Sequence, residues 1–248
     1  METTTTTINK EKIEIHCLGS GSDGNCYVFR KHNEVVLVEC GLAYQVICKK
    51  LIDIGILPTE IKSVICTHAH KDHTLAVPDL FRNGVKLHLT TNIDQGGDVK
   101  DKAKIKLTDW LTVYCFAVNH DVEAYGFAFL DTENKMSYLF INDTALFDFP
   151  LKSIGFDAIF IEYNYIQTQL DAIRRTADHK FKYDRQERTH LSLLDTKQML
   201  SQMNISKPKI IVLMHLSMDC ANETAMKTEI ESVFKIRTLV AKRQGGMN

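Results

Sequence analysis

No run of apolar residues in this 248-residue sequence approaches the roughly 18 that a membrane span needs. The start, Met1-Glu2 followed by five threonines, lacks the charged and apolar regions of a secretory signal. Lys and Arg (30) nearly balance Asp and Glu (31), so the net charge of −1 gives no global attraction to nucleic acid or to an anionic membrane. We therefore expect a cytoplasmic protein with no membrane partner, which meets any polyanion through a local patch.

The cysteines lack any C-x-x-C spacing, and their number, seven, is odd. Reduced thiols fit this pattern better than a disulfide framework does. Six of them lie in apolar surroundings and are expected to pack in the core: Cys17, Cys26, Cys40, Cys48, Cys66 and Cys115. Repeats, linkers and low-complexity segments are absent after the threonines. The sequence therefore predicts a disordered tail over residues 1–11 and one domain over residues 12–248.

A cluster of potential metal ligands follows residues 63–66, an apolar run typical of a buried strand that ends in a loop. The cluster reads Thr67-His68-Ala69-His70-Lys71-Asp72-His73-Thr74 and contains the pattern H-x-H-x-D-H. In an extended segment His68 and His70 point to the same side, and after a turn Asp72 and His73 can hold a second cation. Imidazoles with a carboxylate suit Zn²⁺, with Mn²⁺ or iron as alternatives. The other interpretation is a polar loop of hydrogen-bonded histidines.

A glycine-rich stretch over residues 19–25, Gly-Ser-Gly-Ser-Asp-Gly-Asn, contains G-x-G-x-x-G, and Glu39 follows about twenty residues later. This superficially matches a dinucleotide-binding fingerprint. A dinucleotide-binding loop must lead into a helix. Here it leads into two strand-forming segments, which flank a turn at residues 31–33. We expect a tight β-turn under or beside the metal site.

Strand and helix patterns alternate along the chain. Strands are expected over residues 12–18, 26–29, 35–38, 63–66, 85–90, 105–107, 111–118, 125–130, 136–141, 158–161, 210–214 and 237–241. Helices are expected over residues 42–54, 75–82, from 167, over 189–203 and over 223–234. Polar residues repeatedly end the strands: His120, Asp143, Glu162 and His215. This order predicts a layered α/β sheet sandwich.

A basic segment precedes His190. It contains Arg174, Arg175, Lys180, Lys182, Arg185 and Arg188, and His179 lies within it. Such a run is usually a solvated helix face, and its alternative role is contact with substrate phosphates.

The H-x-H-x-D-H cluster with the later His120, Asp143 and His215 resembles the metallo-β-lactamase superfamily. The likeness runs from Leu18 to Ser217 and implies an αββα four-layer sandwich. Within the superfamily the chain is similar to the phosphodiesterase branch: WalJ-type exonucleases and, more distantly, tRNase Z and the phage anti-Pycsar phosphodiesterases. The detailed markers are the G-S-G-S-x-G-N-C turn, V-E-C-G at 38–41, and H-L-S at 190–192 and again at 215–217.

The resemblance implies two divalent cations, zinc with manganese as the alternative. One would be held by His68, His70 and His120, and the other by Asp72, His73 and His215. Asp143 would bridge them. The family usually has Asp where Glu39 stands, and we expect Glu39 to support the ligands from behind. The catalytic residues expected are Asp72, Glu162 and His190, because Glu162 and His190 match the proton-donating pair of tRNase Z.

Two cations about 3.5 to 4 Å apart would hold a hydroxide that attacks phosphorus. The expected enzyme is a metal-dependent hydrolase, a phosphodiesterase that acts on DNA or RNA ends. Two alternatives are a phosphodiesterase for 3′,5′-cyclic mononucleotides and a metal-binding regulatory module without turnover. Relatives in this branch are often dimers, so the resemblance implies a homodimer.

Overall fold

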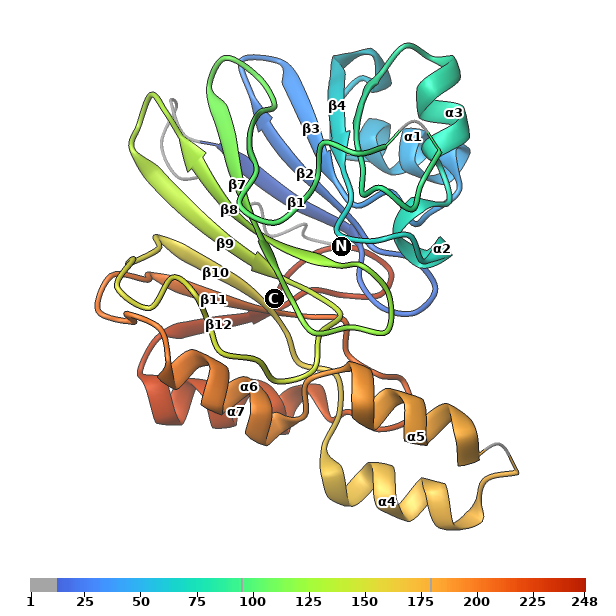
Figure 1. Ribbon diagram of the computed structural model, residues 1–248, viewed down its shortest axis with the longest axis vertical. Helices are drawn as coiled ribbons and strands as arrows, with labels where there is room; N and C mark the ends of the chain where they lie inside the picture. Colours follow the sequence, from blue (N-terminus) through green and yellow to red (C-terminus); the bar gives the residue numbers. More distant parts are fainter. Residues whose placement is uncertain (1–12, 95, 179) are drawn as a thin grey trace.

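A computed structural model describes residues 13–94, 96–178 and 180–248. Its strands form two sheets that face each other, with helices on both outer faces (Figure 1). The expected tail over residues 1–11 lies outside the described residues, as does His179. The α/β sandwich predicted from the sequence is confirmed by these layers.

The first sheet has the order β1-β2-β3-β4-β5. Its strands are β1 (Glu14–Gly19), β2 (Cys26–Lys31), β3 (Glu34–Val38), β4 (Ile61–Ile65) and β5 (Lys86–His88). A two-residue turn joins β2 to β3, and both of its residues, His32 and Asn33, have positive φ (53° and 57°). This backbone matches the twist of an antiparallel hairpin. β3, β4 and β5 then run parallel, so their carboxyl ends lie at one edge.

The second sheet has the order β12-β11-β10-β9-β8-β7-β6. Its strands are β6 (Lys104–Lys106), β7 (Leu111–Ala117), β8 (Tyr125–Asp131), β9 (Met136–Ile141), β10 (Ala158–Glu162), β11 (Ile210–Met214) and β12 (Arg237–Val240). β9, β10, β11 and β12 are parallel neighbours. Residues that follow β9, β10 and β11 therefore lie side by side at the same sheet edge.

Three apolar clusters separate the four layers. Phe29 of the first sheet and Phe129 of the second pack between the sheets, with ring centroids 5.0 Å apart. α1 (Tyr44–Asp53) and α3 (Val77–Arg82) cover the outer face of the first sheet. α6 (Leu193–Ser201) and α7 (Glu223–Phe234) cover the outer face of the second sheet. Strands buried on both faces are continuous apolar runs in the sequence, and these runs predicted the strands.

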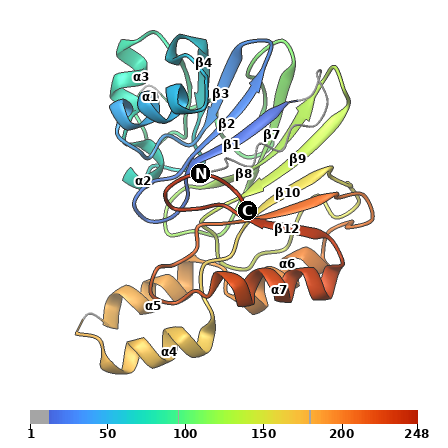
Figure 2. The same cartoon turned by 180° about the vertical axis from the view of Figure 1, so that it is seen from behind.

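Two short helices, α4 (Gln167–Thr176) and α5 (Lys180–Thr189), form a hairpin that projects from the sandwich (Figure 2). The hairpin leaves after β10 and returns before α6. Of the described helices, none has the length and apolar character required to cross a membrane.

Some boundaries differ from the sequence prediction. The helix expected over residues 75–82 starts at Val77, and a separate helix α2 (Lys71–Thr74) precedes it. The helix expected over residues 189–203 starts at Leu193, because Ser192 Oγ accepts a hydrogen bond from Asp195 N–H and caps it. Cys48 is only half-buried on α1, whereas we expected it in the core.

Candidate metal centre

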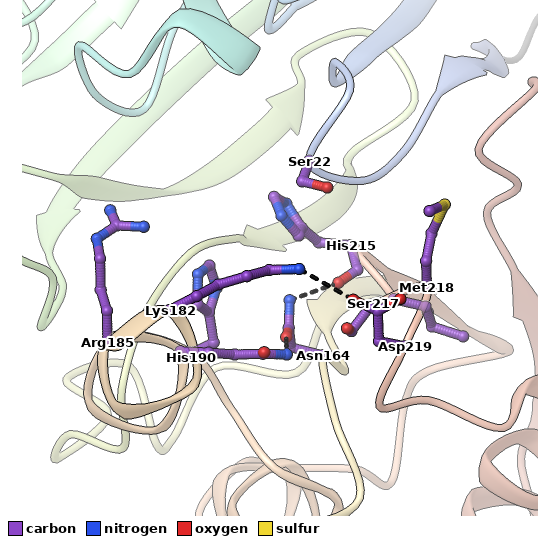
Figure 3. Close-up of a pocket in the computed structure, with 11 residues that line it drawn as sticks. Ser22, Asn164, Lys182, Arg185, His190, His215, Ser217, Met218 and Asp219 are labelled. Atoms are coloured by element: carbon purple, nitrogen blue, oxygen red, sulfur yellow. Dashed lines mark hydrogen bonds and ion pairs between the residues drawn. The ribbon is translucent and has the colours of Figure 1, made fainter. Parts of the chain in front are cut away.

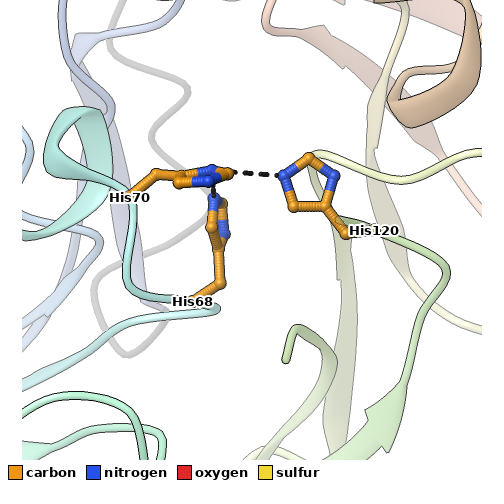
Figure 4. A group of neighbouring side chains, drawn as sticks. All are labelled: His68, His70 and His120. Atoms are coloured by element: carbon orange, nitrogen blue, oxygen red, sulfur yellow. Dashed lines mark hydrogen bonds between the residues drawn. The ribbon is translucent and has the colours of Figure 1, made fainter. Parts of the chain in front are cut away.

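Three histidines from two loops converge on one point at the edge of the sandwich (Figure 4). His68 and His70 follow β4, and His120 follows β7. His70 Nδ1 lies 2.9 Å from His68 Nε2 and 3.2 Å from His120 Nε2. One ligand atom from each of the three falls within 4.8 Å of the others, a spacing that can hold one metal ion.

A second group lies beside the first. Asp72 and His73 belong to α2, Asp143 follows β9 and His215 follows β11. Asp143 Oδ2 lies 3.1 Å from His73 Nε2, and its Oδ1 lies 2.7 Å from His215 Nδ1. Asp143 Oδ2 also lies 3.8 Å from His68 Nε2, so this carboxylate stands between the two groups. The second group can hold a metal ion within the same 4.8 Å limit.

The facing nitrogen and oxygen atoms cannot all be paired by hydrogen bonds among themselves, whereas cations could bind them. An imidazole nitrogen has one proton or one lone pair, so His70 Nδ1 can pair with only one of the two nitrogens that face it. Burial and neighbouring imidazoles hold the pKa of His68 well below its usual value, and burial lowers the pKa of His120 to about 4. Their rings are therefore neutral, with lone pairs available. Asp143 Oδ1 and His215 Nδ1 are buried without hydrogen-bond geometry, as expected of ligand atoms.

Glu39 lies behind both groups and is fully buried. Its Oε1 accepts a hydrogen bond from Thr67 Oγ1 at 2.6 Å and lies 3.3 Å from His73 Nδ1. Because the Thr67 hydroxyl donates to Glu39, it accepts from His68 Nδ1–H at 2.9 Å. A proton on His68 Nδ1 leaves its Nε2 lone pair directed into the site. At His73 the charges of Glu39 and Asp143 outweigh burial and raise the pKa of the ring well above its usual value.

Three site residues adopt left-handed backbone conformations. The φ angles are 65° at Glu39, 45° at Asp143 and 54° at His215. Each residue directly follows a strand or lies one position beyond it. Such conformations are uncommon for residues with side chains and cluster at functional sites. Here they turn the side chains off the sheet edge toward the centre.

The glycine-rich turn supports the second group from below. Asn25 Nδ2 lies 3.2 Å from His73 Nε2 and donates to Asp72 O at 3.3 Å, and Asn25 N–H donates to the same carbonyl at 2.8 Å. The turn therefore lies beside the site, as its sequence context suggested. The contact from Asn25 was missed, although its place in a turn beside the site was a usable signal.

Glu162 and His190 form a third feature. Glu162 ends β10, and its Oε1 lies 2.5 Å from His190 Nδ1. Burial lowers the pKa of His190, but the Glu162 carboxylate outweighs it and raises that pKa to about 9. The His190 ring centre lies 5.8 Å from that of His120 and 5.4 Å from that of His215. A protonated imidazole is thus directed toward both ligand groups.

A pocket of about 150 Å³ opens from this pair (Figure 3). His190 and His215 line it, together with Lys182 and Arg185 of α5 on one side and Asp219 on the other (Figure 3). Lys182 Nζ reaches Asp219 Oδ2 at 2.9 Å.

The rest of the basic segment takes a different place. Arg174 pairs with three carboxylates of the hairpin itself, those of Asp171, Asp184 and Glu187. Within the described part of the segment, Lys182 and Arg185 are the cations that line the pocket. The segment therefore divides into a solvated face and a pocket wall.

The four layers, with a cluster of imidazoles and carboxylates at one edge of the sheets, are those of a metal-dependent hydrolase. The family model of the Metallo-beta-lactamase superfamily matches residues 19–89. Over that segment the chain is similar to this superfamily.

Individual proteins show the same likeness over more of the chain. The exodeoxyribonuclease WalJ of Streptococcus pneumoniae is 25% identical over 220 residues, which cover 81% of this chain and 80% of WalJ. YhfI from Bacillus subtilis, a metallo-beta-lactamase fold protein, aligns with a TM-score of 0.71 at 17% identity, over 96% of this chain and all (100%) of YhfI. Human tRNase Z, short form, aligns with a TM-score of 0.61 at 14% identity, over 92% and 96% of the two chains. The structural likenesses establish a shared fold.

Proposed function

We propose that this protein is a phosphodiesterase that uses two divalent cations to hydrolyse DNA or RNA at its ends. The observation that carries the proposal is the position of Asp143, whose carboxylate lies within 3.8 Å of ligand nitrogens from both groups. We assign one cation to His68, His70 and His120, and the other to Asp72, His73 and His215. Asp143 is assigned to both. The ligand set of imidazoles and carboxylates, without thiolate, favours zinc, with manganese as the alternative.

Divalent cations held by these ligands would supply an activated water as nucleophile and would neutralise charge on the phosphate oxygens. His190 acts as the general acid and gives its proton to the departing alkoxide oxygen. Glu162 keeps that proton on His190 and fixes the ring by the 2.5 Å contact at Nδ1. Because Nδ1 is held by Glu162, Nε2 is the nitrogen that faces the substrate.

Nucleic acid is the favoured substrate for two reasons. The relative WalJ, aligned over most of both chains, is an exodeoxyribonuclease. Lys182 and Arg185 line the pocket beside His190, where they can contact the phosphates of a strand end. Their place on the wall of the pocket distinguishes them from Arg174, which its own hairpin neutralises.

The test is an assay with two substrates. Metal-loaded protein is incubated with 5′-labelled single-stranded DNA and with 3′,5′-cyclic mononucleotides, each with zinc and with manganese. We expect shortening of the DNA from an end and loss of activity in His70→Ala. Cleavage of cyclic nucleotides alone would exclude the nuclease, and an unchanged rate in His70→Ala would exclude the metal mechanism.

Hydrolysis of cyclic mononucleotides is the second candidate. The pocket of about 150 Å³ is small, and the Lys182–Asp219 ion pair links its two sides. A compact nucleotide fits such a space without a track for a longer strand.

We also propose a homodimer, which sedimentation of the purified protein tests.

A further inference from the structure

Asp121, which directly follows His120, holds the three-histidine group and the pocket wall at the same time. Its Oδ1 lies 3.5 Å from His70 Nε2 and 3.1 Å from His120 Nε2. Its Oδ2 accepts from Arg185 Nε at 2.7 Å and lies 2.7 Å from Arg185 Nη2. The two oxygens of one carboxylate therefore face two different parts of the site.

Asp121 Oδ1 lies at ion-pair distance from His70 Nε2, 3.5 Å, which places a carboxylate behind a proposed metal ligand, and it also lies 3.1 Å from His120 Nε2. His70 presents Nδ1 to the other two histidines, so its proton resides on Nε2, the atom near Asp121. Imidazoles that bind metals commonly direct their second N–H to a carboxylate, which fixes the tautomer and strengthens the ligand. The second ring nitrogen of each of the other two histidines already has a hydrogen-bond partner. His68 is held by the hydroxyl of Thr67, and His120 Nδ1–H by the carbonyl of Thr189.

The contact with Arg185 sets the direction of a pocket cation. Arg185 belongs to α5 of the projecting hairpin and lines the pocket together with His190 and His215. Its side chain is 41% exposed, so without a partner it would sample many conformations. With Nε and Nη2 occupied by Asp121, the guanidinium keeps donors free for an anion in the pocket.

We propose that Asp121 is a positioning residue that orients His70 for the metal and Arg185 for the substrate phosphate. This inference rests on the proposed phosphodiesterase function. It adds a link between the metal centre and the hairpin, because one side chain, that of Asp121, contacts both the proposed ligand His70 and Arg185 of α5.

The experiment measures zinc affinity of the metal-free full chain by competition with a chromophoric chelator. We expect Asp121→Asn to weaken zinc binding by about tenfold or more, the usual effect of losing a carboxylate behind a ligand histidine. Asp219→Asn is the matched control, because it breaks the other ion pair between α5 and the pocket without touching an imidazole. Its zinc affinity should stay within about twofold of the wild type. Equal affinities of Asp121→Asn and wild type would overturn the inference.

Arg185→Gln separates the two roles of Asp121. We expect its KM for labelled DNA to rise while its zinc affinity and kcat stay near those of the wild type. Asp121→Asn should show both the higher KM and the weaker zinc binding, and Asp121→Glu should recover part of the affinity. A wild-type KM in Arg185→Gln would overturn the role of that contact. Wild-type protein that binds zinc but cleaves no phosphodiester would refute the proposed function alone, since the affinity comparison needs no substrate.

Discussion

Gly41 and Asp72 are in contact through their backbones: a β-carbon on Gly41 would lie 1.7 Å from the Asp72 carbonyl oxygen. No side chain fits at this position while α2 stays in place. Cys40 N–H also donates to the carbonyl of His73 at 2.8 Å, so the end of β3 and the ligand-bearing helix are packed directly together. The position of two proposed metal ligands thus depends on the absence of one methyl group.

Gly41→Ala should displace α2 and weaken the binding of zinc. We expect a loss of at least about tenfold in zinc affinity, comparable with removal of a supporting residue. Gly55→Ala is the control: the φ of 77° at Gly55 strains an alanine there, but its β-carbon would meet open space. Chelator competition and circular dichroism of both variants measure the effect. Wild-type affinity in Gly41→Ala would show that α2 can move without cost to the site.

Glu39→Gln should weaken the cation at His73 and the cation at His68 together. The neutral amide loses the charge that holds Nδ1–H of His73 and can turn its NH₂ toward Thr67. We expect about ten- to a hundredfold lower metal affinity, measured as bound zinc per chain across a chelator series. Thr67→Val removes only the link to His68 and should affect one cation. Two fully bound cations in Glu39→Gln would contradict the shared support.

The activity should fall at alkaline pH as His190 loses its proton. The Glu162 carboxylate raises the pKa of His190 to about 9, above the ordinary 6.5, so the acid form persists through neutral pH. Cations in the adjacent groups repel the imidazolium and move the fall below that value. In Glu162→Gln the raising charge is lost while burial still lowers the pKa, so the alkaline limb of kcat/KM should shift to lower pH. A limb unchanged in Glu162→Gln would assign it to another group.

Lys31 and Asp131 should make a large contribution to stability away from the site. Lys31 Nζ lies 3.1 Å from both Asp131 oxygens, and their side chains are 3% and 0% exposed. Lys31 Nζ also lies 2.7 Å from Oε2 of Glu133, whose side chain is 47% exposed. Asp131→Asn leaves the ammonium with this partner alone and should cost about 3 kcal/mol in urea unfolding, the low end for a broken buried pair. Asp53→Asn, which removes the exposed Lys49–Asp53 pair, should cost less than about 1 kcal/mol. Similar losses in both variants would mean that burial does not set the cost.

The strands and the polar residues that end them were accessible from the sequence because they depend on local signals, whereas the ligand roles came from the resemblance. Apolar runs mark strands buried on both faces, and His120, Asp143 and His215 stand where such runs end. Parallel neighbours then bring strand ends together, so Asp143 and His215 meet across 72 residues of chain. The metal roles of these residues stay a prediction.

Other features depend on packing that no local pattern reveals. The link from Glu39 through Thr67 to His68 requires β3 and β4 to be adjacent and parallel. The left-handed conformation of Asp143 (φ 45°) cannot be told from the residue type, because aspartate more often adopts other conformations. The pair of Asp121 and Arg185 joins segments 64 residues apart through the hairpin, whose placement periodicity cannot give. Cys48 was misplaced because an apolar neighbourhood in sequence does not tell which side of a helix a residue occupies.

The α4–α5 hairpin is one continuous segment between β10 and α6. The proposed ligands and Glu162 lie elsewhere, at strand ends and on α2. Under the proposed function, the residues that react and those that select the substrate therefore lie in different parts of the chain, joined where His120 meets Thr189 and Asp121 meets Arg185. An exchange of residues 167–184 that keeps Arg185 and Thr189 would re-specify the molecule that is cut and leave the proposed ligands in place.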